Sequence, residues 1–233
     1  MTAESSPAAD APPAEELKLR VREFWDRASC GETYAEGTSD QAYYESHAKA
    51  RYELEPYIFD FARFADGRER DVLEIGVGMG ADHVEWAKSA PRSLTGVDLT
   101  PRAVEHAKKR LAVYGLSSDV RTADAEALPF AENSFDIVYS WGVLHHSPNT
   151  SQAIREVHRV LRPGGEARIM IYHKYALTGY MLWARYGLFK GRPGRSLDDI
   201  YAAHLESPGT KAYTLDEAPR CAASLRRPMR VRC

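Results

Sequence analysis

A hydrophobic run that ends in three closely spaced glycines constrains this chain more than any other part of its sequence. Residues 71–80 read Asp-Val-Leu-Glu-Ile-Gly-Val-Gly-Met-Gly. An apolar run of this length favours a buried strand, and glycine lets the backbone turn tightly or approach a ligand closely. A helix that follows such a turn offers free backbone N–H groups. We therefore predict a strand, a loop that binds a nucleotide-like ligand through Gly76, Gly78 and Gly80, and then a helix. The alternative is a tight turn with a structural role only.

Strands and helices alternate from residue 67 onward. Apolar runs predict strands at residues 72–75, 94–97, 119–122, 135–140 and 167–172. Thr100 and Pro101 are typical of a helix start, and Gly115 of a helix end. A second helix is predicted from Asn149 until Pro163 and the two glycines after it. This alternation predicts a Rossmann-like, doubly wound α/β fold with a mainly parallel sheet.

The local composition divides the chain into four segments. Residues 1–14 are rich in Ala, Pro and acidic residues, which predicts a disordered tail. Residues 15–66 are predicted to form an N-terminal helical cap, with helices at 15–28, 40–54 and 57–64. Its many aromatic side chains either pack on the main domain or line a pocket on it. Residues 67–174 form the predicted core domain, and 175–233 an apolar lid or helix with an atypical tail.

The overall composition excludes several classes of protein. The 233 residues carry a net charge of −2, with 44% hydrophobic and 27% charged side chains, which fits one α/β domain and no binding of nucleic acid through bulk charge. We expect no membrane-spanning helix, since no apolar run approaches 18 residues. The start of the chain lacks the features of a signal peptide, which favours a cytoplasmic protein. Cys30, Cys221 and Cys233 are spaced too far apart for a cysteine metal site, so we expect free thiols and no metal.

Further motifs follow the predicted strands. Asp98 ends the second strand, where a carboxylate can accept both hydroxyl groups of a ribose; an exposed acid is the alternative. Asp124 and Ala125 begin the stretch Asp-Ala-Glu-Ala-Leu-Pro-Phe after the third strand. Gly-Val-Leu-His-His follows the fourth strand at 142–146, and Leu-Arg-Pro-Gly-Gly precedes the fifth at 161–165.

These motifs, in this order and spacing, resemble those of the class I S-adenosylmethionine-dependent methyltransferases, in particular the type 11 branch that acts on small molecules. The resemblance is close over residues 70–174. It implies that S-adenosyl-L-methionine is the cofactor. It also implies that Gly76, Gly78 and Gly80 wrap the methionine and ribose parts of the cofactor, and that Glu74 supports this loop.

The resemblance implies positions for the rest of the cofactor as well. Asp98, with Leu99 beside it, would meet the ribose hydroxyl groups, and Asp124 with the Ala125 backbone would meet the adenine edge. Residues from Ser140 to position 146 would lie beside the sulfonium and the acceptor. Because this methyl donor is already activated, the protein has mainly to align the reacting atoms and to exclude water.

His145 and His146 are the candidate catalytic residues. An acceptor that starts protonated needs a base, and imidazole titrates near neutrality. Tyr44, Tyr52 and His173 are further candidates. The alternative is that the two histidines only fix the loop or face solvent.

The C-terminal part departs from the pattern of the family. Apolar side chains spread around the predicted helix at 175–189, which fits burial against protein, or a lid over a hydrophobic acceptor, better than attachment to a membrane surface. The C-terminal antiparallel β-hairpin of the family is missing or atypical, since only residues 229–232 could form a strand. We therefore expect a truncated or frame-shifted end and a fifth strand exposed at the sheet edge.

The sequence thus predicts an enzyme that transfers a methyl group from S-adenosylmethionine to a small, hydrophobic molecule by in-line displacement. A cofactor-binding protein without turnover, from a truncated or damaged copy, is the alternative from another class. An NAD-dependent oxidoreductase is disfavoured, because such enzymes use G-x-G-x-x-G where this chain has G-x-G-x-G. The acceptor and the oligomeric state are not predicted.

Overall fold

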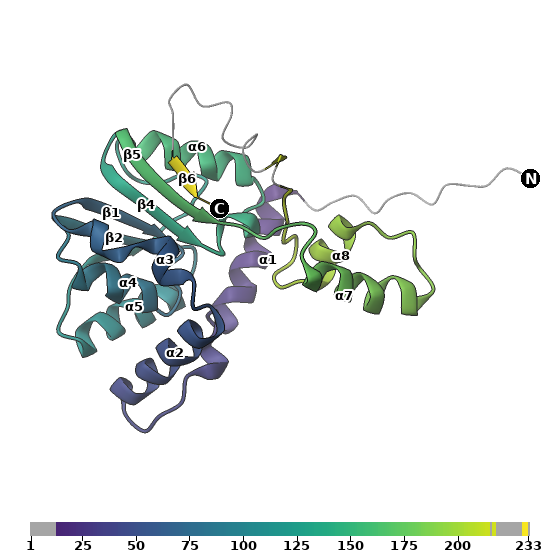
Figure 1. The fold of residues 1–233 in the computed structure, drawn as a ribbon, viewed down its shortest axis with the longest axis horizontal. Coiled ribbons are helices and arrows are strands. Elements are labelled where there is room, and N and C mark those ends of the chain that lie inside the picture. The colour runs from purple at the N-terminus through teal and green to yellow at the C-terminus, as the bar shows by residue number, and fades with distance from the viewer. Residues whose placement is uncertain (1–12, 215, 218–229, 233) are drawn as a thin grey trace, which may run out of the picture.

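The computed structural model describes residues 13–214, 216–217 and 230–232, which form a sheet covered by helices on both faces (Figure 1). The strands run in the order β3-β2-β1-β4-β5-β6, and each is parallel to its neighbours. They are β1 (Asp71–Ile75), β2 (Ser93–Asp98), β3 (Asp119–Thr122), β4 (Phe135–Trp141), β5 (Leu161–Met170) and β6 (Arg230–Arg232). The prediction of a Rossmann-like fold with a mainly parallel sheet is confirmed.

Different helices cover the two faces of the sheet. On one face α6 (Thr150–Val160) packs on the central strands, where Val157 and Val138 are fully buried. On the other face lie α3 (Ile58–Ala62), α4 (Ala81–Lys88) and α5 (Pro101–Val113), and Trp86 of α4 is fully buried against Tyr139 of β4. Burial on both faces explains why these strands are almost continuously apolar.

The helices α2 (Asp40–Leu54), α5 and α6 begin at capping side chains, and the sequence indicated two of these, Thr100 and Asn149. Ser39, Thr100 and Asn149 each accept a backbone N–H three residues further on, in the first turn of α2, α5 and α6. This bond satisfies one of the N–H groups that a helix start leaves unpaired. The second helix, α2 (Asp40–Leu54), therefore has the predicted bounds, whereas α3 is shorter than the predicted 57–64.

The N-terminal helices α1 (Ala14–Arg27), α2 and α3 lie against the core (Figure 1). Arg51 of α2 is held by Asp82 of α4 through two bonds, from Nε at 3.0 Å and from Nη2 at 2.7 Å. Arg110 of α5 donates to the backbone oxygen of Tyr44 at 2.7 Å. These buried polar contacts fix α2 over the carboxyl ends of the strands.

The edge of the sheet beyond β5 is paired. Residues 166–168 of β5 pair with β6 in parallel register, so the expectation of an exposed fifth strand is wrong for these residues. β5 also begins earlier than the predicted 167–172, because Leu161 pairs with Phe135 ahead of a register shift. Residues 215, 218–229 and 233 lie outside the described part of the chain, and so do Cys221, Cys233 and all but two residues of the predicted tail at 1–14.

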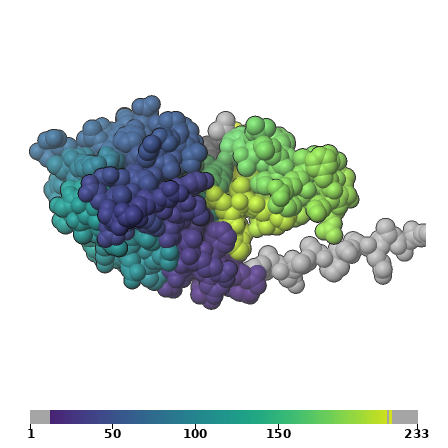
Figure 2. All heavy atoms as spheres, turned by 90° about the horizontal axis from the view of Figure 1, so that it is seen from below, coloured from purple at the N-terminus to yellow at the C-terminus, as the bar shows by residue number. Residues whose placement is uncertain are grey.

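A lobe of two helices, α7 (Leu177–Tyr186) and α8 (Leu197–His204), stands beside the core (Figures 1 and 2). The helices pack on each other, and Tyr201 donates to the backbone oxygen of Lys174 at 2.7 Å. Leu177, Met181 and Phe189 are 76%, 64% and 80% exposed, so the expectation of burial against protein is wrong for these side chains. Among the described helices, none combines the length and apolarity needed to cross a bilayer.

Candidate functional site

A cavity opens at the carboxyl ends of β1 and β4, which lie side by side although their crossover connections lead in opposite directions. Such a switch point is where ligands bind in doubly wound folds. The empty space among its lining residues is about 1310 Å³, open solvent at the mouth included. The predicted site residues that line it are Glu74, Gly76, Gly78, Asp98, Leu99, Asp124, Ala125 and His146. Gly80, Ser140 and His145 do not line it.

The glycines after β1 differ in what surrounds them. Gly76 and Gly78 have φ values of +83° and +49°, which residues other than glycine rarely adopt. A Cβ added to Gly76 would come within 2.1 Å of Val143, so this glycine is needed for packing. A Cβ added to Gly78 would meet nothing within 4 Å, so the backbone here borders open space in the cavity. Gly78 is therefore the glycine that a ligand can approach most closely.

Asp98 is fixed at the end of β2 by the neighbouring loops. One carboxylate oxygen accepts the backbone N–H of Gly78 at 3.1 Å, and the other accepts the N–H and the hydroxyl of Thr100 at 3.0 Å each. Burial raises the pKa of Asp98 above its ordinary value, although these bonds favour the charged form. The carboxylate is thus held in one orientation at the cavity wall, where two ribose hydroxyl groups could donate to it.

Asp124 lies beside Ala125 in the loop after β3, next to the end of β2, and contacts the cap. Lys18 of α1 lies 2.8 Å from the Asp124 carboxylate and 3.0 Å from that of Glu126. Burial opposes the charged form of Lys18, but the two carboxylates outweigh it and raise the pKa of Lys18. The helix α1 is thereby joined to the loop where the family places adenine.

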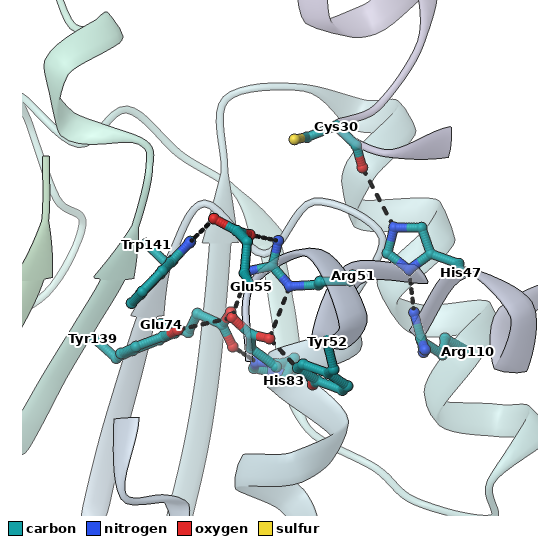
Figure 3. Close-up of polar contacts among 11 residues, drawn as sticks. Cys30, His47, Arg51, Tyr52, Glu55, Glu74, His83, Arg110, Tyr139 and Trp141 are labelled. Carbon is teal, nitrogen blue, oxygen red and sulfur yellow. Dashed lines mark hydrogen bonds and ion pairs between the residues drawn. The ribbon is translucent and has the colours of Figure 1, made fainter. Parts of the chain in front are cut away.

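The end of the cavity under the cap combines apolar and polar groups. Trp25, Trp141 and Met170 provide apolar surface, and the Trp141 indole donates to Glu55 at 3.1 Å. Arg51 contacts the same Glu55 at 3.4 Å and completes a polar rim (Figure 3). The geometry suits a small molecule with an apolar body and one or two polar groups.

Buried charges beneath the cavity support its floor (Figure 3). Glu74 lies 2.8 Å from the Nδ1 atom of His83, and burial raises the pKa of Glu74 despite this contact. Tyr139 donates to Asp82 at 2.8 Å, on the carboxylate that also holds Arg51. Glu74 of β1 is thus tied to His83 of α4, the helix that follows the glycine loop.

The two adjacent histidines have different surroundings. His145 is fully buried, and burial, together with the nearby His146 and Lys211, holds its pKa well below the ordinary value, so it stays neutral. His146 reaches the cavity wall, with its ring 5.2 Å from that of Trp25. Of the other candidate bases, Tyr44 and Tyr52 are held within the protein by His106 and Asp82, and His173 is exposed. His146 is thus the predicted base that can meet an acceptor.

Several cavity residues were not identified from the sequence. They are Lys18, Trp25, Cys30, His47, Glu55, Tyr172 and Glu206. Of these, the first five, Lys18 to Glu55, lie within the segment predicted as the cap, residues 15–66. Glu206 lies in a loop after α8, about sixty positions from His146 along the chain, and no pattern in the sequence relates the two.

Comparisons with known proteins agree with this geometry. The model of the methyltransferase domain family matches residues 73–169. The chain is 37% identical over 108 residues to the ubiquinone/menaquinone biosynthesis C-methyltransferase UbiE of Desulfotalea psychrophila, over 46% of this chain and 43% of that protein. It is 38% identical over 98 residues to the 27-O-demethylrifamycin SV methyltransferase of Amycolatopsis mediterranei, over 40% of this chain and 35% of that protein. The chain thus matches less than half the length of these curated relatives.

A solved structure supports the fold. The YcgJ protein of Bacillus subtilis superposes with a TM-score of 0.57 at 24% sequence identity, over 73% of this chain and 67% of that one. The matched residues 73–169 contain the glycine loop, Asp98 and Asp124. Residues 73–169 thus form a methyltransferase domain of the class I S-adenosylmethionine-dependent type.

Proposed function

We propose that this protein transfers a methyl group from S-adenosyl-L-methionine to a small, largely apolar acceptor by in-line displacement. The observation that carries the proposal is the division of one cavity into two ends. The loops after β1, β2 and β3 present the groups that suit an adenosine, and the end under the cap presents apolar surface with a polar rim. Enclosure of both ends in one cavity would bring donor and acceptor together.

The chain's residues fit this cofactor. Open space beside Gly78, the fixed carboxylate of Asp98 and the loop at Asp124 would hold its methionine, ribose and adenine parts. When bound, the cofactor supplies an electrophilic methyl group on a positively charged sulfur. The protein's own work is then to orient the acceptor toward that methyl group and to keep water out.

The cap residues would exclude water from the reacting atoms. Trp25 of α1 and Trp141 of β4 form apolar walls, while the ion pair of Arg51 and Asp82 holds α2 in place. An apolar acceptor would gain from this surface roughly in proportion to the area that it buries, at about 25 cal/mol per Å². We infer that the acceptor's body packs between these tryptophans.

The polar atom of the acceptor would lie at His146. This imidazole lines the cavity together with Tyr172 and Glu206, and Tyr172 donates to Glu206 at 2.9 Å. These side chains can hold a hydroxyl or thiol group of the acceptor and receive its proton.

The test is transfer of label from methyl-labelled S-adenosylmethionine to a panel of small apolar molecules. Each molecule carries a hydroxyl group, a thiol group or a nucleophilic carbon atom. Once an acceptor is found, we expect His146→Ala to lower kcat by roughly 10²- to 10⁴-fold, the usual size of a lost acid-base contribution, and to leave cofactor affinity unchanged. The exposed His173→Ala is the matched control and should retain activity. A loss of less than about tenfold in His146→Ala would show that this residue does not act on the acceptor.

A further inference from the structure

Two histidines and a glutamate converge at the polar end of the cavity. His145 and His146 belong to the short helix η3 (Leu144–His146) after β4, and Glu206 belongs to the loop after α8. One possible ligand atom from each lies within 4.8 Å of the other two. Both imidazoles are buried, and the Glu206 side chain keeps about a third of its surface exposed.

The ring nitrogens of these histidines are poorly satisfied. Among the described residues, neither nitrogen of His145 has a hydrogen-bond partner, and the same holds for Nε2 of His146. That Nε2 atom lies 3.2 Å from Oε2 of Glu206, but not in hydrogen-bond geometry. A buried polar atom without a partner costs about 1–3 kcal/mol, so three of them in one place call for an explanation.

The contacts at Nδ1 of His146 allow the tautomer that has its lone pair on Nε2. The Thr210 hydroxyl donates to the backbone oxygen of Ser207 at 2.7 Å, so the Thr210 oxygen is free to accept from Nδ1 of His146 at 2.9 Å. The Ser207 hydroxyl oxygen also lies 2.8 Å from Nδ1. With the proton assigned to Nδ1, the lone pair is on Nε2 and faces the Glu206 carboxylate. Two electron-rich atoms at this distance attract a cation between them.

We propose that His145, His146 and Glu206 bind a divalent transition metal ion, with zinc as the best match. Two imidazoles and one carboxylate are the ligand set of a catalytic zinc site, in which the fourth position stays open. Zinc bonds of about 2.0–2.2 Å place tetrahedral ligand atoms roughly 3.4 Å apart, so atoms that now lie within 4.8 Å of one another would move closer on binding. The cysteine pattern had given no indication of a metal, because none of these ligands is a cysteine.

Neighbouring side chains already hold the ligands as a metal site requires. Ser207 and Thr210 fix the ring of His146 through its other nitrogen, and Tyr172 donates to the second oxygen of Glu206 at 2.9 Å. The Tyr172 ring also packs on His145, with centroids 4.0 Å apart. Such partners set the tautomer and orientation of metal ligands, and their loss usually lowers metal affinity 10- to 100-fold.

The open position of this metal would face the acceptor end of the cavity, because His146 and Glu206 both line it. There the ion would coordinate a hydroxyl or thiol of the acceptor and lower its pKa. With a metal bound, the ion would therefore activate the acceptor in place of the His146 imidazole, because Nδ1 is then protonated and Nε2 is on the metal. This consequence rests on the proposed function, whereas metal binding does not.

Metal binding is tested on the full chain, freed of any histidine tag and stripped with a chelator. After equilibration with zinc and gel filtration, we expect about one zinc ion per chain by mass spectrometry. Cobalt in its place should give the strong visible absorption of a four-coordinate site. His146→Ala and Glu206→Gln should each lower affinity at least about 100-fold, and Thr210→Val about 10- to 100-fold.

Matched controls keep the result interpretable. His173→Ala and Cys30→Ser lie outside the ligand set and should retain the metal. Because His145 is buried, His145→Ala can cause a folding defect, which circular dichroism detects. In that case the metal affinity of Glu206→Gln, whose side chain is more exposed, decides whether this cluster binds the metal. Absence of stoichiometric zinc, or zinc retained in both Glu206→Gln and His146→Ala, would overturn the proposal. A protein that binds zinc but transfers no methyl group would refute the proposed function and leave the metal site standing.

Discussion

At the scale of single residues, Asp98 joins the cofactor end of the cavity to the loops around it. Its carboxylate accepts from Gly78 and Thr100 and would accept from the ribose. We expect Asp98→Ala to weaken S-adenosylmethionine binding by about 1.5–3 kcal/mol, or roughly 10- to 150-fold, since hydrogen bonds to a charged group have this size. Calorimetry measures the effect, and the exposed Asp60→Asn is the control. Wild-type affinity in Asp98→Ala would remove this residue from the site.

His47 gives the cap a dependence on pH. Burial, with the nearby Arg110, lowers the pKa of His47 to about 4, and Arg110 donates to its Nδ1 atom at 3.1 Å. The unfolded chain takes up a proton near pH 6.5, whereas the folded chain does so only near 4, so falling pH across this window favours unfolding.

We therefore expect His47 to contribute a loss of up to about 3 kcal/mol in unfolding free energy between pH 6.5 and 4. Denaturant unfolding at several pH values measures it, with His47→Gln as the comparison. The variant should lose less stability than the wild type over this window. If the unfolding free energies of the two proteins fall in parallel with pH, His47 has the same pKa in the folded and the unfolded chain.

The place of a residue in the fold could be predicted where a strand end defines it. Asp98 and Asp124 follow strands that their apolar neighbours make easy to identify, and parallel strands bring such ends together. Glu206 and Lys18 could not be predicted in this way, because they reach the cavity from the loop after α8 and from α1. Contacts between segments that are distant in sequence depend on packing that no local pattern records.

At the scale of elements, the loop after β1 contains two glycines with separable roles. Gly78→Ala should lower the free energy of unfolding by only about 1–2 kcal/mol, which is the cost of a left-handed backbone at a residue with a Cβ. No clash adds to this cost, because the new Cβ meets open space. That Cβ would enter the cavity, so cofactor affinity should fall at least tenfold. Gly76→Ala adds a clash with Val143 and should cost more than about 3 kcal/mol.

Thermal unfolding and calorimetry on the two variants check this pair. Equal destabilisation by both substitutions would contradict the packing role of Gly76. Unchanged cofactor binding in Gly78→Ala would contradict the approach of a ligand at that position.

Element bounds were predictable where side chains mark the ends. The Ser39 cap and Pro56 give α2 its predicted bounds, since a proline disfavours helix in the residue before it. The predicted start of β5 was wrong. Leu161 pairs with Phe135, although the Pro163-Gly-Gly stretch that follows is of a kind that usually interrupts strands and helices. Pairing with a neighbouring strand outweighed the local signal.

At the scale of the whole molecule, the chain combines a methyltransferase core with a cap on the cavity and a lobe beside it. The core could be predicted because apolar runs in the sequence mark its strands and the helices between them. The exposure of the lobe of α7 and α8 could not be predicted. Its apolar residues indicated burial, but Leu177 and Phe189 are largely exposed. Composition measures how apolar a segment is and does not say which surface covers it.

The proposed function depends on the binding of S-adenosylmethionine in the cavity. Titration calorimetry of the purified chain with S-adenosylmethionine, S-adenosylhomocysteine and NAD tests it most directly. We predict saturable binding of the two adenosyl ligands at one site per chain, at least tenfold tighter than NAD, because the glycine spacing G-x-G-x-G differs from the G-x-G-x-x-G of dinucleotide sites. Tighter binding of NAD, or no binding of either adenosyl ligand, would contradict the account.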